Sequence, residues 1–248
     1  MTTTIVAALR SERIKFATLR SQWIAPLVAL ALTVGITTAV NAAYGQVDHT
    51  PGEDQSEGIY YGLQFGHVAV ACVGILLIGQ EFDTRMIGTS LTAVPRRGRL
   101  YGAKLALGAG VGLLLGLVST VGSFLVVAAT AGVDLSALGT GRSFLAGVLY
   151  HPLLVVLCLG LTAVLRNLGV ALGLLTPMLF LGTTLLAAIP GVREAGQFLP
   201  DRAGFHAMRT QADPTVHYGH WTGLLIMALW AAAYAGLRSV RRYAVRSG

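Results

Sequence analysis

Residues 105–130 read LALGAGVGLLLGLVSTVGSFLVVAAT, and this run contains no charged side chain. A helix rises about 1.5 Å per residue, so about 20 residues cross the hydrocarbon core of a bilayer. The run is much longer than a buried strand, which usually has about 4–8 residues. The stretch therefore predicts a membrane-spanning α-helix.

The composition of the whole chain agrees with that prediction. Of the 248 residues, 54% are hydrophobic and 12% are charged. Soluble domains carry roughly 25% charged residues. The mean hydropathy is +0.67. This composition excludes a disordered chain, a disulfide scaffold and an ordinary cytosolic enzyme, and it predicts an all-α membrane protein.

Six apolar blocks are long enough to span a bilayer. Six spans and their connections nearly exhaust the chain, so we predict one transmembrane domain over residues 1–248, without a separate soluble catalytic domain. The expected spans cover residues 23–44, 60–79, 105–130, 144–165, 168–189 and 221–237.

The charges between the blocks predict the topology. One set of segments, residues 1–22, 81–104, 166–167 and 238–248, holds 14 Lys and Arg residues and 3 acidic residues. The remaining segments hold 4 Lys and Arg residues and 8 acidic residues. Because basic loops stay in the cytoplasm, both termini are expected there, in a plasma membrane protein. The net charge of +7 is then mainly a topology signal, and no nucleic-acid partner is expected.

The N-terminal segment 1–22 has two interpretations. On a helical wheel, Ile5, Leu9, Phe16 and Trp23 fall on one side, although Glu12 and Arg20 lie near it. We favour an interfacial helix whose basic residues suit the anionic cytoplasmic leaflet. The alternative is a basic leader that only orients the protein. The basic residues are Arg10, Arg13, Lys15 and Arg20.

The connection after the second span reads QEFDTRMIGTSLTAVPRRGRLYGAK over residues 80–104. It begins with acids and continues with apolar residues at helical spacing, which are Phe82, Met86, Ile87 and Leu91. Pro95 then precedes a basic cluster of Arg96, Arg97, Arg99 and Lys104. The pattern predicts a short cytoplasmic helix that stops at the proline. Such a helix suits a docking surface for a cytoplasmic partner.

A few polar residues lie at membrane depth, namely Gln64, His67 and His151. They are candidates for a substrate path, and the favoured alternative is that they make hydrogen bonds between helices. Gly108, Gly112 and Gly116 recur every four residues. This spacing favours close helix packing, either within the bundle or between two copies.

Several kinds of chemistry are absent from the sequence. The only lysines are Lys15 and Lys104, and neither belongs to a G-x-x-x-x-G-K-[ST] motif, so no P-loop ATPase activity is expected. We predict no enzyme, cofactor or metal site, and we interpret Cys72 and Cys158 as buried hydrophobic residues. The acidic residues 48–57 are interpreted as a solvated external loop. Residues 190–220 form a second external loop, in which 198–208 could form a short helix at the membrane edge.

The chain resembles the permease subunit of type-2 ABC transporters, in particular their short actinobacterial branch. The loop resembles the family pattern E-[YF]-x-x-G-T-[IL]-R-x-[ST]-L-x-x-x-P-R-R. It agrees at Glu81, Phe82, Ile87, Thr89, Ser90, Leu91, Pro95, Arg96 and Arg97, and departs at Arg85, Met86 and Gly88. The segments 11–15, 19–23, 199–204 and 221–242 are also similar to that branch.

The resemblance implies a non-enzymatic exporter subunit. Residues 81–91 would form a coupling helix that docks on a separate ATP-binding subunit, which would hydrolyse the ATP. A second permease copy or a paralogue would complete the pore within the lipid bilayer. The implied contacts with the ATPase are Glu81, Phe82, Arg85, Ile87, Thr89 and Leu91.

Two other functions remain open at this level. One is an ATP-independent carrier or channel that uses Gln64, His67 and His151 as its polar path. The other is a membrane anchor or assembly factor without transport. The permease hypothesis adds one specific expectation, which is that Glu81→Lys uncouples transport without unfolding the bundle.

Overall fold

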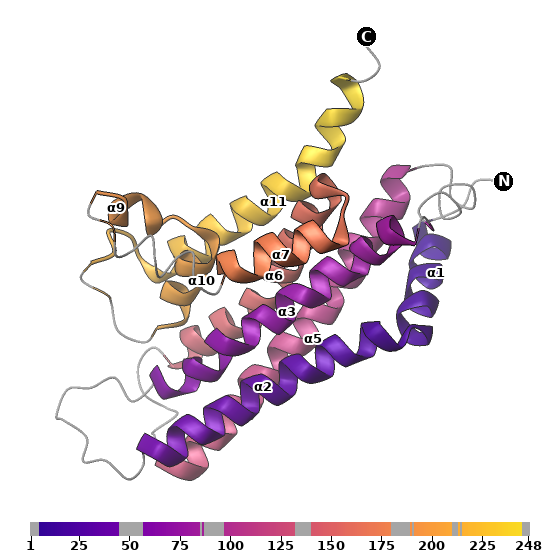
Figure 1. Cartoon of the computed structure of the whole chain (residues 1–248). Helices are drawn as coiled ribbons and strands as arrows, with labels where there is room; N and C mark the ends of the chain where they lie inside the picture. Colours follow the sequence, from indigo (N-terminus) through magenta and orange to yellow (C-terminus); the bar gives the residue numbers. More distant parts are fainter. Residues whose placement is uncertain are drawn as a thin grey trace.

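The computed structural model describes residues 5–44, 57–84, 86, 97–131, 140–179, 189, 191–209, 213 and 215–244. Helices account for all the regular secondary structure within these residues. Five helices are long and apolar enough to cross a membrane, which is the architecture of a multi-pass membrane protein (Figure 1). They are α2 (Arg20–Tyr44), α3 (Glu57–Asp83), α5 (Arg97–Ala131), α6 (Thr140–Leu165) and α11 (His220–Ala244).

Shorter helices complete the described fold. They are α1 (Ile5–Thr18), α7 (Leu168–Pro177), α9 (Arg193–Gly196) and α10 (Pro200–Met208). At 10 residues, α7 is too short to span a bilayer. The span predicted over 168–189 continues into residues outside the described ones, so a sixth span stays a prediction. However, α7 begins where α6 ends, whereas α9 and α10 lie at the opposite end of the bundle (Figure 1).

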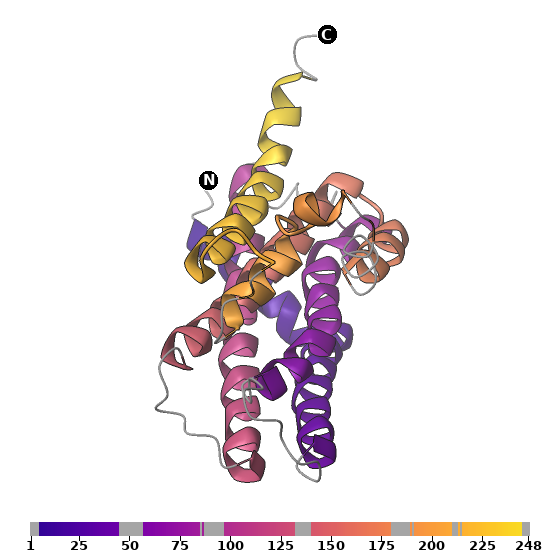
Figure 2. The same ribbon diagram turned by 90° about the vertical axis from the view of Figure 1, so that its left-hand side faces the viewer.

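The structure gathers the basic segments at one end. Helix α1 and the C-terminal half of α11 share that end with the last turn of α3 and the start of α5 (Figures 1 and 2). The charge pattern predicted this grouping. That this end faces the cytoplasm remains a prediction.

Helix α3 forms the centre of the bundle. The apolar window of α3 is 72% buried, against 17% for α2 and 22% for α11. Its side chains Leu63, Ile75 and Ile78 are fully buried. The outer helices instead expose large apolar side chains, as lipid-facing helices do. Examples are Leu27, Leu114, Leu125, Leu225 and Leu229.

Glycines allow α5 and α6 to approach closely. A Cβ at Gly116 would lie 2.3 Å from the Val148 carbonyl oxygen, and one at Gly112 would lie 2.6 Å from Pro152 Cα. Gly108 is less constrained, since the nearest atom would be Leu77 Cδ1 at 3.2 Å. Of the two alternatives for this stripe, the structure shows packing within the bundle.

A second pair of glycines joins α2 to α3, and sequence reasoning missed it. A Cβ at Gly62 would lie 1.9 Å from Thr37 Oγ1, and one at Gly66 would lie 1.8 Å from Thr33 Oγ1. Both threonine hydroxyls donate to carbonyls of their own helix, so they are satisfied inside the contact. Their four-residue spacing is the signal that could have revealed this contact.

Three helices extend beyond the spans predicted for them. Helix α5 begins at Arg97 rather than Leu105, and α3 continues through Asp83 rather than ending at residue 79. Helix α11 extends to Ala244, through most of the predicted tail. In each case charged residues continue a helix past its apolar run, because only the apolar run must lie in hydrocarbon.

We expect Gly116→Val to lower the melting temperature of the purified protein by about 5 °C or more, because overpacking costs about 1–3 kcal/mol and a backbone carbonyl cannot turn aside. Gly110→Val is the matched control, since Gly110 lies on the same helix with no atom near its missing Cβ. Equal melting temperatures for the two variants would contradict this packing.

Candidate functional site

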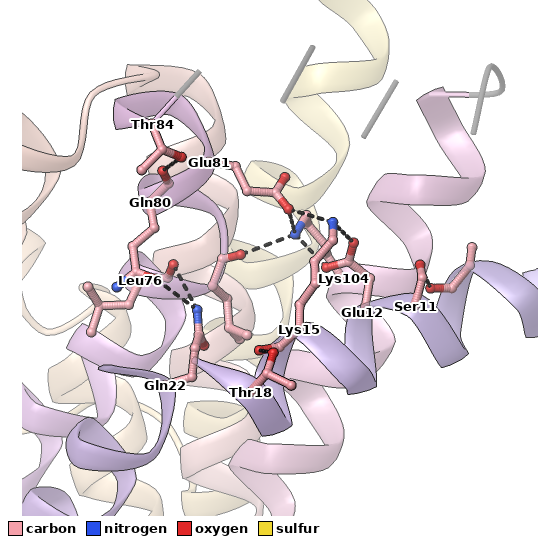
Figure 3. A network of polar contacts seen from close by, with 12 residues as sticks. Ser11, Glu12, Lys15, Thr18, Gln22, Leu76, Gln80, Glu81, Thr84 and Lys104 are labelled. Atoms are coloured by element: carbon pink, nitrogen blue, oxygen red, sulfur yellow. Dashed lines mark hydrogen bonds and ion pairs between the residues drawn. The ribbon is translucent and has the colours of Figure 1, made fainter. Parts of the chain in front are cut away.

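Four charged side chains meet at the end of the bundle that holds α1 (Figure 3). Glu12 and Lys15 come from α1, Glu81 from the last turn of α3 and Lys104 from α5. Lys104 Nζ lies 2.5 Å from Glu12 Oε2 and 2.9 Å from Glu81 Oε1. We call these four residues the ion cluster. It joins three helices that are distant in sequence.

Burial makes this cluster energetically important. Glu12 and Lys104 are each 3% exposed, and Glu81 is 8% exposed. Removing one charge from water costs several kcal/mol, and only close pairing and hydrogen bonds offset this cost. The Lys104 ammonium has three hydrogens and three acceptors. The acceptors are the two carboxylates and the Leu77 carbonyl, which lies 3.3 Å away.

Lys15 completes the cluster from its more exposed side. Its Nζ lies 2.8 Å from Glu12 Oε1 and 2.9 Å from Glu81 Oε1, and its side chain is 31% exposed. Partial burial lowers the pKa of Lys15, but the hydrogen bonds and charges of the two glutamates outweigh this effect and raise the pKa above its ordinary value. The cluster is thus formed by two carboxylates and two ammonium groups, and their charges cancel.

Sequence reasoning did not bring these residues together. It placed Lys15 toward lipid, treated Lys104 as part of a basic anchor, and regarded Glu12 as an interruption of the apolar side of the helix. The signal available in the sequence was the scarcity of lysine. The chain has only two lysines, and both belong to the cluster. Charged residues that border apolar blocks are expected to find partners, since unpaired burial is so costly.

A second polar contact ties α2 to α3 beside the cluster. Gln22 Nε2 donates to the Leu76 carbonyl and to Gln80 Oε1, both at 3.3 Å. Gln80 Nε2 in turn donates to Ser21 Oγ at 2.8 Å. The start of α2 and the end of α3 are therefore held together where α1 meets the bundle.

The expected coupling residues are only partly described. Glu81 and Phe82 belong to the last turn of α3, while Arg85, Ile87, Thr89 and Leu91 lie outside the described residues. The carboxylate of Glu81 turns inward to the ion cluster (Figure 3), and Phe82 packs against the core. Lysine at position 81 would place three ammonium groups together, so Glu81→Lys is expected to disturb folding and is a poor probe of coupling.

The candidate path residues separate into two environments. The side chain of Gln64 is exposed, whereas His67 is 2% and His151 0% exposed. His67 Nε2 lies 3.2 Å from the Leu179 carbonyl. His151 Nε2 lies 3.2 Å from Ser119 Oγ, and its Nδ1 lies 3.0 Å from the Gly147 carbonyl. These bonds between and within helices correspond to the favoured alternative for both histidines.

Aromatic rings connect the two buried histidines. The ring of Phe205, on α10, lies 5.4 Å from that of His67 and 5.2 Å from that of Tyr150, measured between centroids. Tyr150 lies 5.8 Å from its neighbour His151. The structure therefore brings His67 and His151 into one buried region that Phe205 and Tyr150 fill, and Gln64 does not join them.

Helix α10 is fixed between α6 and α11 at the opposite end of the bundle. Arg142 donates to the carbonyls of Ala207 and Arg209, and Ser143 donates to that of Met208 at 2.6 Å. These bonds satisfy carbonyls that a helix C-terminus leaves open. A Cβ at Gly204 would lie 2.5 Å from the Tyr150 ring, so this contact requires glycine. The structure has the helix Pro200–Met208 in the segment 198–208, for which the sequence left a short helix open.

His206 lies in the same region and is 5% exposed. Its Nε2 lies 3.0 Å from the Tyr218 carbonyl, and its ring stacks on His220 at 4.9 Å. Burial is the main cause that lowers the pKa of His206 below its ordinary value, and nearby His220 acts in the same direction. The folded protein therefore favours the neutral imidazole.

Comparison with known proteins gives no match to a family model, a curated protein or a solved structure. Within the described residues, no group of three or more His, Cys, Asp or Glu is arranged to hold a metal ion.

We expect Lys104→Met to destabilise the protein by about 3–5 kcal/mol, because it leaves two buried carboxylates without their main cation. Glu12→Gln together with Lys104→Met should cost less than the sum of the single changes, since the pair interacts directly. Lys15→Met is the milder comparison, because Lys15 is partly exposed. Thermal melts at neutral pH compare the wild type, Glu12→Gln, Lys104→Met, the double variant and Lys15→Met, and additive effects of the two single changes would argue against the pairing.

We expect the protein to lose stability as the pH falls below about 6.5, the ordinary pKa of histidine. Because burial lowers the pKa of His206, the unfolded chain takes up the proton first, so stability declines until the folded-state pKa is passed. Arg209, Asp213 and His220 face the same group.

Melting temperatures measured from about pH 8 to about pH 5 test this expectation. His206→Gln should make the decline less steep, since an amide can still donate to the Tyr218 carbonyl but does not titrate. His217→Gln, at an exposed position of the same end, is the control for the histidine-to-glutamine change itself. An unchanged decline in His206→Gln would assign the effect to another group.

Proposed function

We propose that the chain is the membrane-spanning permease subunit of an ABC exporter and that a separate subunit hydrolyses the ATP. The five apolar helices and the loop pattern at residues 81–97 support this proposal. The observation that best supports the proposal is the ion cluster. It links the end of α3 and the start of α5, which are the two helices that flank residues 85–96, and it links both to α1.

The cluster offers a physical route for coupling. A partner that pushes on the segment between α3 and α5 would act on both helices together, because Lys104 joins them through Glu81. Helix α1 would move with them through Glu12. Since α3 packs against α2, α5, α6 and α7, a shift at its end would reach most of the bundle. In the proposed cycle, ATP binding by the partner drives such shifts between inward-facing and outward-facing states.

The alternative of an ATP-independent carrier gains no comparable support. It relies on Gln64, His67 and His151, but Gln64 is exposed and both histidines are engaged in buried contacts. The proposal also includes a second permease copy or a paralogue, as the resemblance implies.

We expect a mild-detergent pull-down of the tagged chain from its native membranes to recover a P-loop protein in stoichiometric amount. The eluate should hydrolyse ATP, because the chain itself has no P-loop. Mass spectrometry and a phosphate-release assay provide the measurements. A chain that is recovered alone and inactive, under conditions that preserve a known membrane complex, would refute the permease function.

Lys15→Gln provides a sharper test of the coupling route. This side chain is the most exposed of the ion cluster, so its loss should leave the complex assembled. In bilayers, transported substrate should stimulate the ATPase rate of this variant complex several-fold less than that of the wild-type complex. Arg166→Gln removes a positive charge from the same end, outside the cluster, and should have no such effect. Equal rates in both variants would remove the ion cluster from the coupling route.

A further inference from the structure

The outer surface of α1 and of the first turn of α2 is strongly basic. Helix α1 turns sharply away from α2 near Leu19 (Figure 1). Arg10 and Arg13 of α1 and Arg20 of α2 are exposed. None of the three forms a hydrogen bond or ion pair with another described residue. Their charges are therefore available to an external ligand.

The fold removes the compensating negative charge from this surface. Glu12 is the only acidic residue among residues 1–44, and it is buried against Lys104 in the ion cluster. Lys15 also turns toward the cluster. Because Glu12 and Lys15 both turn into the cluster, the outer side of this region keeps three guanidinium groups and no carboxylate. This arrangement is not visible in the sequence, where Glu12 stands between Arg10 and Arg13.

Apolar side chains border the three arginines. Ile14 and Leu19 are exposed, and the apolar surface continues along the lipid-facing side of α2 through Trp23 and Ile24. Trp23 packs against Phe16 and donates its Nε1 hydrogen to the Ala17 carbonyl, so its indole is fixed at the junction of the two helices. Tryptophan is enriched at the boundary between hydrocarbon and headgroups.

We infer that this surface, formed by Arg10, Arg13, Arg20 and Trp23, binds the headgroups of anionic phospholipids in the adjoining leaflet. Guanidinium groups pair with phosphate oxygens in a bidentate manner, and acyl chains cover the neighbouring apolar side chains. Continuity of these apolar side chains with the apolar exposed side of α2 favours a lipid over a soluble acidic partner. The inference goes beyond the proposed function, because it holds whether or not an ATPase binds.

Trp23 allows a direct test in the purified full-length chain. The protein is reconstituted in phosphatidylcholine bilayers that contain a minor fraction of brominated lipid, which quenches tryptophan fluorescence on contact. Brominated phosphatidylglycerol and brominated phosphatidylcholine are compared at equal fractions. Trp23→Phe identifies the part of the signal that belongs to Trp23, and Trp221 and Trp230 provide a common background.

We expect the anionic lipid to quench Trp23 more strongly than the zwitterionic lipid, and high salt to reduce the difference. Each arginine near the surface should contribute up to about fivefold in relative affinity. The triple variant Arg10→Gln, Arg13→Gln, Arg20→Gln should abolish the selectivity, whereas Arg166→Gln should preserve it.

Two results would overturn the inference. One is equal quenching of Trp23 by the two lipids, and the other is undiminished selectivity in the triple variant. Helical content and melting temperature, measured on the same samples, show that the variant remains folded. No ATPase is present in these bilayers, so the outcome is independent of the permease proposal.

Discussion

The pairing of the Lys104 ammonium with two buried carboxylates constrains the fold more than any other polar contact described. Lys104 lies in the second turn of α5 and is compensated by Glu12 of α1, Glu81 of α3 and the Leu77 carbonyl. A buried charge needs partners at hydrogen-bonding distance. One side chain therefore fixes the positions of α1 and α3 relative to α5. It also determines which residues of α1 face outward, and thus makes that outer surface uniformly basic.

The opposite end of the molecule is held together by different means. There, Arg142 and Ser143 of α6 satisfy the carbonyls at the end of α10, and Gly204 brings α10 against the ring of Tyr150. Between the two ends, glycines allow close contacts of α5 with α6 and of α2 with α3. The ion cluster thus holds one end together, while small residues and capping of backbone carbonyls organise the middle and the opposite end of the bundle.

The buried histidines and the ion cluster differ in what they offer to function. The buried histidines within the bundle, His67 and His151, are occupied by contacts with carbonyls, a serine hydroxyl and aromatic rings. The ion cluster, in contrast, lies beside the segment for which the sequence predicts docking. A contact that joins both flanks of that segment is well placed to transmit motion, because the joined helices cannot shift independently. The anionic-lipid surface lies on the outer side of the same α1 helix, so the bilayer and the cluster act on opposite faces of one element.

The sequence alone determined the helical class and five of the spans, because long apolar runs have few alternatives to a membrane helix. It also predicted which segments share an end, and it left open whether residues 198–208 form a helix. It did not reveal that Glu12 meets Lys104, that Gln64 is exposed while His67 is buried, or that Gly62 and Gly66 contact Thr37 and Thr33. These depend on the rotation of each helix about its axis and on contacts between residues far apart in the chain. Helix rotation follows from packing against neighbours rather than from the local pattern, so only the tertiary structure decided it.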